Sequence, residues 1–357
     1  MSNVHLRARI FTLLGIAAIV PLTSPATADS GDTFVGSREI CIVATDGACP
    51  ASADAELIPD AECALVSVDG EATLDEAAGS CCYPVTVECR EIENCGCYGR
   101  PFVLEGRPVQ APATERSDWA RGPVPAIAGL SANQRARLAQ FWTDNGLAEH
   151  SSVAGFARFA LDLCAHGAPP ELVHRALVAA VEETAHARLC FALASAYADA
   201  PVGPGALEMN GAAPVARTLV ELAVHTAREG AIGETLSAYI AAEMLARATD
   251  PAVRHVLEQI VREEGRHAEL AWATLKWAIA AGGEPVRAAV AAELATAGLT
   301  VPDDLDVDAI LEGHGLVSAA RLRRCVDEGV RTLVAPAAAA LTAVGAARRA
   351  GEDAARV

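Results

Sequence analysis

The sequence lacks the features of an integral membrane protein and of a nucleic-acid-binding protein. The apolar stretch near its start, residues 10–20, has eleven residues, whereas a transmembrane helix needs about 20. Later Ala-rich stretches are interrupted by charges. Basic residues are scarce, with 28 Lys and Arg against 46 Asp and Glu, and Lys276 is the single lysine. This acidic balance disfavours nucleic acid and anionic membranes as partners.

The first 28 residues have the organisation of a secretory signal peptide. Arg7 and Arg9 precede the apolar residues 10–20, and small residues at 26–28 offer a cleavage site. Cleavage would leave 26 basic and 46 acidic residues and no membrane span. We therefore expect an exported protein, found in the periplasm, the cell envelope or the medium. An uncleaved membrane anchor is the alternative.

Cysteine is concentrated in residues 29–110. Eight of the eleven cysteines lie there: Cys41, Cys49, Cys63, Cys81, Cys82, Cys89, Cys95 and Cys97. An even number in a short exported segment predicts a small disulfide-stabilised domain, and β-prone runs such as residues 83–89 predict strands in it. The number of cysteines does not determine their pairing. A zinc site is the alternative, although no pair of C-x-x-C motifs is present.

The rest of the chain predicts a mainly α-helical protein. Residues 111–130 are rich in Pro and read as a linker, and residues 131–283 predict a four-helix bundle. Residues 284–357 predict an Ala-rich helical extension that packs on the bundle or contacts another chain. A capping box at Ser131 and Gln134 opens the first helix. The four helices are expected at 131–165, 170–198, 214–248 and 251–281.

Two Glu-x-x-His steps carry the chemistry of the bundle. Residues three apart on a helix share a face, so each step can direct a carboxylate and an imidazole to one point. One further glutamate precedes each step on the preceding helix. Four helices with this set predict a carboxylate-bridged site for two metal ions. The candidate ligands are Glu149, Glu183, His186, Glu234, Glu264 and His267.

An internal duplication supports this interpretation. Residues 181–191 align with residues 262–272, with Glu-Glu, His-Ala, Leu and an aromatic residue at the same offsets. The separation from the single Glu to the His is 37 residues in the first half and 33 in the second. We interpret the two halves as helix hairpins that each contribute half of a site.

Several neighbouring residues are alternatives to these ligands. At about 1.5 Å per residue, Glu234 lies about 22 Å from the turn at Asp250, matching the returning helix, whereas Glu229 lies about 30 Å away. Glu182 and Glu263 fall near the ligand face, where they would support the histidines or replace the neighbouring glutamates as ligands. His150 is rotated off that face. Cys190, one turn past His186, is expected to be a buried thiol. An acidic surface with two incidental histidines is the alternative for the whole set.

With these motifs, residues 131–282 resemble the ferritin-like superfamily of two-metal carboxylate bundles, which includes rubrerythrins, bacterioferritins and manganese catalases. The resemblance implies that the six candidate ligands bind two iron or manganese ions. The glutamates would ligate or bridge the ions, and each histidine would bind one of them. The export signal and the cysteine-rich region depart from intracellular members.

Two functions remain open. The resemblance implies an exported two-metal oxidoreductase that acts on ferrous iron, oxygen or peroxide, of ferroxidase, peroxidase or catalase type. Carboxylates and imidazole suit both Fe and Mn and do not distinguish them. The alternative is an extracytoplasmic binding or envelope protein in which the bundle is a metal-stabilised scaffold. In that case, a protein partner would bind residues 29–110 or the C-terminal extension.

Overall fold

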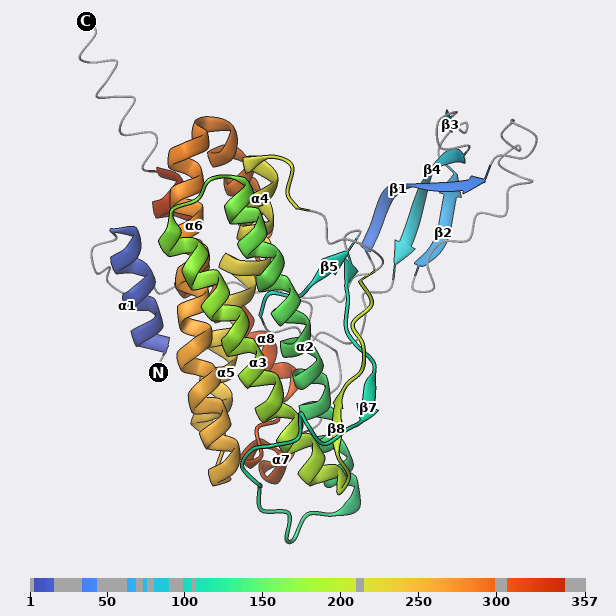
Figure 1. The fold of residues 1–357 in the computed structure, drawn as a ribbon, viewed down its shortest axis with the longest axis vertical. Helices are drawn as coiled ribbons and strands as arrows, with labels where there is room; N and C mark the ends of the chain where they lie inside the picture. Colours follow the sequence, from blue (N-terminus) through green and yellow to red (C-terminus); the bar gives the residue numbers. More distant parts are fainter. Residues whose placement is uncertain are drawn as a thin grey trace, which may run out of the picture. The chain divides into compact units, whose positions relative to one another are not determined.

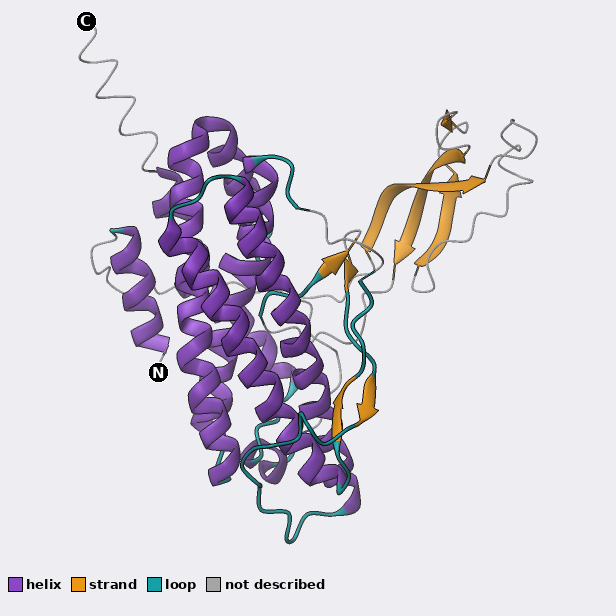
Figure 2. Ribbon diagram, viewed as in Figure 1, coloured by secondary structure: helices purple, strands orange, loops and turns teal. Residues whose placement is uncertain are grey.

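The protein is mainly helical, with small antiparallel strand pairs (Figures 1 and 2). The computed structural model describes residues 3–15, 34–43, 63–68, 73–75, 80–89, 99–104, 107–209, 215–298 and 307–343. The chain divides into two compact units. The smaller is Pro21–Cys95, and the larger combines Met1–Val20 with Gly96–Val357.

The smaller unit contains an antiparallel sheet in the order β1-β4-β2, with β3 also pairing with β4. Its strands are β1 (Phe34–Val43), β2 (Cys63–Val68), β3 (Thr73–Asp75) and β4 (Ser80–Cys89). The register places the Cα atom of Cys41 opposite that of Cys82, and Cys63 opposite Cys89. The cysteine side chains of this unit lie outside the described residues, so the expected disulfides stay a prediction.

The first helix pair of the larger unit is α2 (Ala132–Ala165) and α3 (Pro170–Ala198). Both match the predicted bounds. The side chain of Ser131 accepts a hydrogen bond from the Gln134 backbone N–H, and the Gln134 side-chain oxygen accepts one from the Ser131 backbone N–H, so the predicted capping box is present. Pro170 occupies the first turn of α3, where a missing N–H costs nothing.

The second pair is α6 (Pro251–Leu294) and a composite helix. That helix consists of α4 (Leu219–His225), the π-helical segment η1 (Thr226–Glu234) and α5 (Thr235–Arg247). It runs beside α6 along the length of the bundle (Figure 1). Asp250 caps α6 by accepting hydrogen bonds from the N–H groups of Ala252 and Val253. Helical structure was predicted over 214–248, but the π-helical turns within it were not.

The fourth helix does not end at residue 281 as predicted. Gly283 breaks it with φ 66° and ψ −144°, and helical structure then resumes through Pro285 to Leu294. Beyond it lie α7 (Ala309–Gly313), α8 (Ala319–Gly329) and η2 (Val330–Val334). Buried apolar side chains of this extension, including Leu322 and Leu333, join the core of the helices. The expected packing of the C-terminal extension on the bundle is therefore present.

Short strands and one more helix complete the larger unit. β5 (Val103–Leu104) pairs with β6 (Arg107–Pro108), and β7 (Ala113–Glu115) pairs with β8 (Val202–Pro204). Part of the Pro-rich segment 111–130 is thus hydrogen-bonded to the chain that follows α3.

Helix α1 (Asn3–Leu14) packs on α6 through buried Leu6, Ile10 and Phe11. In the described part of the chain, no helix is long and apolar enough to cross a membrane.

Candidate metal centre

Six side chains from four helical segments converge in the middle of the bundle. They form two overlapping groups, each with ligand atoms within 4.8 Å of one another. One group contains Glu149 and His186, the other contains Glu234 and His267, and both include Glu183 and Glu264. All six are buried, with at most 5% of any residue exposed. They are the six residues that the sequence singled out, and such groups could hold metal ions.

The same ring nitrogen of each histidine faces the carboxylates. His186 Nδ1 lies 3.6 Å from Glu149 Oε2, 3.6 Å from Glu183 Oε2 and 3.4 Å from Glu264 Oε1.

His267 Nδ1 lies 3.0 Å from Glu183 Oε1, 3.3 Å from Glu264 Oε1 and 4.0 Å from Glu234 Oε2. The ring centroids of the two histidines are 6.0 Å apart. Glu183 and Glu264 therefore lie between two similar clusters of ligand atoms.

These atoms have no hydrogen-bond partners of their own. The buried atoms without a partner include both carboxylate oxygens of Glu183, Glu234 and Glu264, one of Glu149, and Nδ1 of both histidines. Buried polar groups are nearly always hydrogen-bonded, and an unpaired buried charge costs several kcal/mol (order of magnitude). Four carboxylates gathered in this way, with the two imidazoles, could hold metal ions. The donor set, oxygen and imidazole nitrogen, suits Fe and Mn.

Two further glutamates hold the histidines from outside. His186 Nε2 is 2.9 Å from Glu263 Oε2, and His267 Nε2 is 2.9 Å from Glu182 Oε2. Each glutamate thus bonds the histidine of the other hairpin. Arg262 and Gln259 in turn donate to Glu263.

Arg266 donates to Glu182 in the same way. A carboxylate on Nε2 fixes the ring so that Nδ1 is free to coordinate. This contact accounts for Glu182 and Glu263, which the sequence left as alternative ligands.

The π-helical segment decides between Glu234 and Glu229. Glu234, the last residue of η1, is fully buried within the cluster. Glu229 instead accepts hydrogen bonds on both oxygens from Arg158 Nη2, at 3.1 and 3.0 Å, and lies 3.5 Å from Arg100 Nη1. The two glutamates are five positions apart, which is the hydrogen-bond spacing of a π-helix, yet their side chains have separate partners.

The mutual proximity and burial of the six side chains shift their pKa values. Burial, and next the charge of Glu183, raise the pKa of Glu149 well above its usual range. Burial and the charge of Glu264 raise the pKa of Glu234 in the same way. Burial alone would lower the pKa of His186, but the carboxylates beside it, Glu149 first, raise it well above that of free histidine.

The pKa of His267 is also raised well above the ordinary value. Burial opposes this shift, and the carboxylates of Glu182 and Glu183 outweigh it. The raised pKa of both histidines favours their imidazolium forms, which offset the charge of the carboxylates beside them.

The remaining sequence candidates lie outside the cluster. His150 is half-buried, and its ring meets Trp119 edge-on with 5.2 Å between centroids. Cys190 is a fully buried thiol, as expected, and burial raises its pKa well above the usual value.

Sequence reasoning missed Arg100 and Arg158, because nothing in a lone arginine predicts burial. The available signal was the pair Gly230 and Gly233 inside a helix, since glycine there often permits close approach of another backbone.

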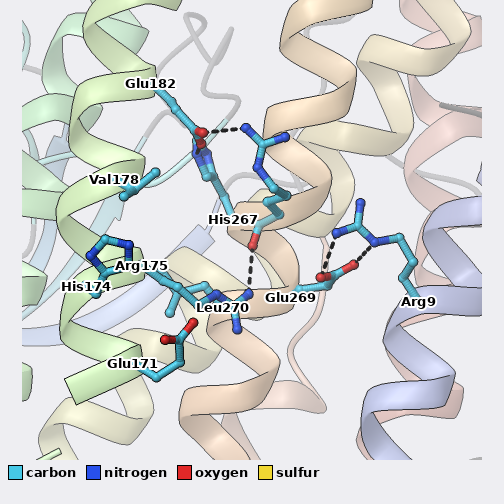
Figure 3. Close-up of a pocket in the computed structure, with 10 residues that line it drawn as sticks. Arg9, Glu171, His174, Arg175, Val178, Glu182, His267, Glu269 and Leu270 are labelled. Carbon is cyan, nitrogen blue, oxygen red and sulfur yellow. Dashed lines mark hydrogen bonds and ion pairs between the residues drawn. The ribbon is translucent and has the colours of Figure 1, made fainter. Parts of the chain in front are cut away.

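One cavity lined by described residues reaches the cluster at His267. It has a volume of about 360 Å³ and opens between α3 and α6. Glu182 and His267 lie at one end (Figure 3). Arg175 donates a hydrogen bond to the backbone oxygen of Arg266 along its wall. A small molecule could thus approach the His267 side of the cluster.

In comparisons with known proteins, no protein-family model, no curated protein and no solved structure matches this chain.

Proposed function

We propose that the protein binds two iron or manganese ions in a ferritin-like four-helix bundle. The observation that carries this proposal is the set of partnerless oxygen and nitrogen atoms that share the centre of the bundle. One ion would bind between Glu149 and His186, and the other between Glu234 and His267. Glu183 and Glu264 would serve both ions, since each belongs to both groups.

The activity we propose is that of an oxidase acting on ferrous iron, or on oxygen or peroxide. Held by the six side chains, two such ions would be oxidised as they supplied the electrons that reduce an oxidant. The protein's own residues exclude water by burial and hold both imidazoles through Glu182 and Glu263. The cavity at His267 would admit a reactant of a few atoms.

Export is part of this proposal and rests on the signal-like residues 1–28. The direct check is the N-terminal sequence of protein recovered from the expressing cells and from their medium. A mature chain that begins near residue 29 supports export. A chain that retains α1 packed on α6 in the cytoplasm contradicts it.

Metal analysis of the purified protein tests the proposed site. Wild-type protein should bind two Fe or Mn per chain and consume oxygen on addition of ferrous iron. Glu264→Ala and His267→Ala should lose metal while keeping their helical circular dichroism. Matched controls on the same helix are Glu258→Ala and His255→Ala, because Glu258 and His255 are exposed. Unchanged metal content in the first two variants contradicts the assignment. A folded protein without metal or redox activity favours the scaffold function.

A further inference from the structure

Residues 99–104, which we call the strap, lie against the bundle beside the candidate metal centre. Glycines on two helices make room for the strap. A Cβ atom at Gly155 of α2 would lie 2.4 Å from Arg100 O, and one at Gly233 of η1 would lie 3.0 Å from Gly99 O. Real Cβ atoms essentially never approach so closely as 2.4 Å, so α2 and the strap need glycine here. Gly99 itself has φ +101°, a conformation that favours glycine.

Hydrogen bonds fix the strap along α2. The Phe102 N–H donates to Ser151 Oγ at 3.0 Å, and Arg158 Nη1 donates to Val103 O at 2.6 Å. Ser151 Oγ donates onward to Val109 O at 2.6 Å. Both Ser151 and Arg158 are buried. The strap is therefore an integral part of the bundle wall.

The side chain of Arg100 enters the bundle from the strap. It is only 2% exposed. Its guanidinium carbon lies 3.9 Å from the ring centroid of Phe159, and Nη1 lies 3.5 Å from Glu229 Oε2. A Cβ at Gly230 would lie 2.4 Å from Arg100 Nη2, so the absence of a side chain at Gly230 of η1 leaves the space that Arg100 occupies. Arg100 thus fixes the π-helical turn that ends at Glu234.

Arg100 also reaches the second half of the metal centre through an aromatic ring. Phe156 has its ring centroid 5.4 Å from the guanidinium carbon of Arg100 and 4.9 Å from the ring centroid of His267. On the other side, a Cβ at Gly99 would lie 3.9 Å from Glu234 Oε2. The strap therefore borders Glu234 at Gly99, and it reaches His267 only through the Phe156 ring.

The duplicated hairpins differ at this point. Phe156 follows Glu149 by seven residues, and the residue that follows Glu234 by seven is Ala241. At the matching position the second hairpin therefore has an alanine and no aromatic ring comparable to Phe156. The contacts of the Arg100 side chain with η1 and Phe156 therefore lead to the Glu234–His267 half of the centre.

We propose that Arg100 is a positioning residue for the Glu234–His267 half of the metal centre. Held by the strap, it keeps η1 and the Phe156 ring in place, so that Glu234 and His267 share one divalent cation. This inference rests on the proposed function. It adds that the two ions bind unequally when Arg100 is replaced, because the Arg100 side chain contacts η1 and the Phe156 ring, whereas no contact among the described residues joins it to Glu149 or His186.

Titration with Mn²⁺ alone tests the proposal. Free Mn²⁺ is followed by its electron paramagnetic resonance signal, which yields the number of bound ions and each dissociation constant. Wild-type protein should bind two ions. Arg100→Met should keep the first and bind the second at least about tenfold more weakly, which is about 1.4 kcal/mol. Arg100→Lys, which keeps the charge but not the planar fork, should show a smaller loss of the same ion.

The matched control is Arg135→Met on α2. Arg135 donates a hydrogen bond to the backbone oxygen of Tyr197 and lies fourteen residues before Glu149, about 21 Å along the helix. This variant should bind two ions as wild-type protein does. If Arg100→Met does not fold, the test relies on Arg100→Lys. An unchanged dissociation constant for the second Mn²⁺ ion in Arg100→Lys then overturns the proposal.

Two other results also overturn the proposal. One is that Arg100→Met binds both ions normally despite a lower melting temperature, since the role is then structural only. The other is that both ions weaken equally. Failure of the proposed function looks different, because wild-type protein then binds no Mn²⁺ and both proposals fall.

Discussion

The contact between Glu263 and His186 gives a prediction whose size follows from the structure. Glu263→Ala removes the only hydrogen-bond acceptor of His186 Nε2, at 2.9 Å, in a place where His186 is fully buried. Loss of such an outer carboxylate typically weakens metal binding by about 10–100-fold, or about 1.4–2.8 kcal/mol. Glu263 has a side chain only 9% exposed, so water replaces it poorly and we expect a loss toward the upper end.

The corresponding change on the other histidine should have a smaller effect. Glu182 is 16% exposed and borders the cavity, so water can take its place on His267 Nε2. We expect Glu182→Ala to weaken binding by about tenfold. Glu263→Gln keeps an acceptor oxygen but loses the charge, and should fall between wild-type protein and Glu263→Ala.

Isothermal titration with Mn²⁺ measures these differences, with Glu258→Ala as the control. Glu258 lies on the same helix with 55% of its side chain exposed. A double substitution with His186→Ala should cost no more than His186→Ala alone, because Glu263 acts through that ring. Wild-type affinity in Glu263→Ala, or full additivity in the double variant, would refute this role for Glu263.

Four further predictions follow from other contacts. Glu229→Ala should lower the free energy of unfolding by about 3–5 kcal/mol in chemical denaturation, because two buried arginines lose their carboxylate. Glu234→Ala should mainly lower the metal content measured by metal analysis. The raised pKa values of both cluster histidines mean that metal displaces protons, so Mn²⁺ affinity should rise with pH. A thiol reagent at mildly alkaline pH, followed by peptide mass spectrometry, should modify exposed Cys164 and spare buried Cys190. Dithiothreitol should make residues 29–110 far more sensitive to protease than the bundle, and equal resistance would argue against disulfides.

The helices and the six clustered side chains were predictable because their signals are local or repeated. Ser131 and Asp250 cap helices through contacts within three residues, which sequence pattern alone exposes. The two Glu-x-x-His steps gain weight from their duplication. Helix arithmetic placed Glu234 at the level of the other clustered side chains, where the structure has it, although it assumed regular α-helical rise throughout a segment that contains η1.

The π-helical turns and the burial of Arg100 could not be predicted, because their causes are neither local nor repeated in the sequence. Both depend on contacts between distant segments, such as the approach of the strap to Gly230 and Gly233. The continuation of α6 beyond Gly283 is similar, because Val286 and Val290 are held in the core by packing rather than by local preference. Tertiary contacts outweigh intrinsic propensity at such positions.

The anomalous X-ray scattering of crystals grown with Mn²⁺ tests the central claim most directly. The proposed function predicts two peaks per chain, about 3.5–4 Å apart, one beside His186 Nδ1 and the other beside His267 Nδ1. A single peak elsewhere, or no peak among these carboxylates in crystals that contain the metal, would contradict it.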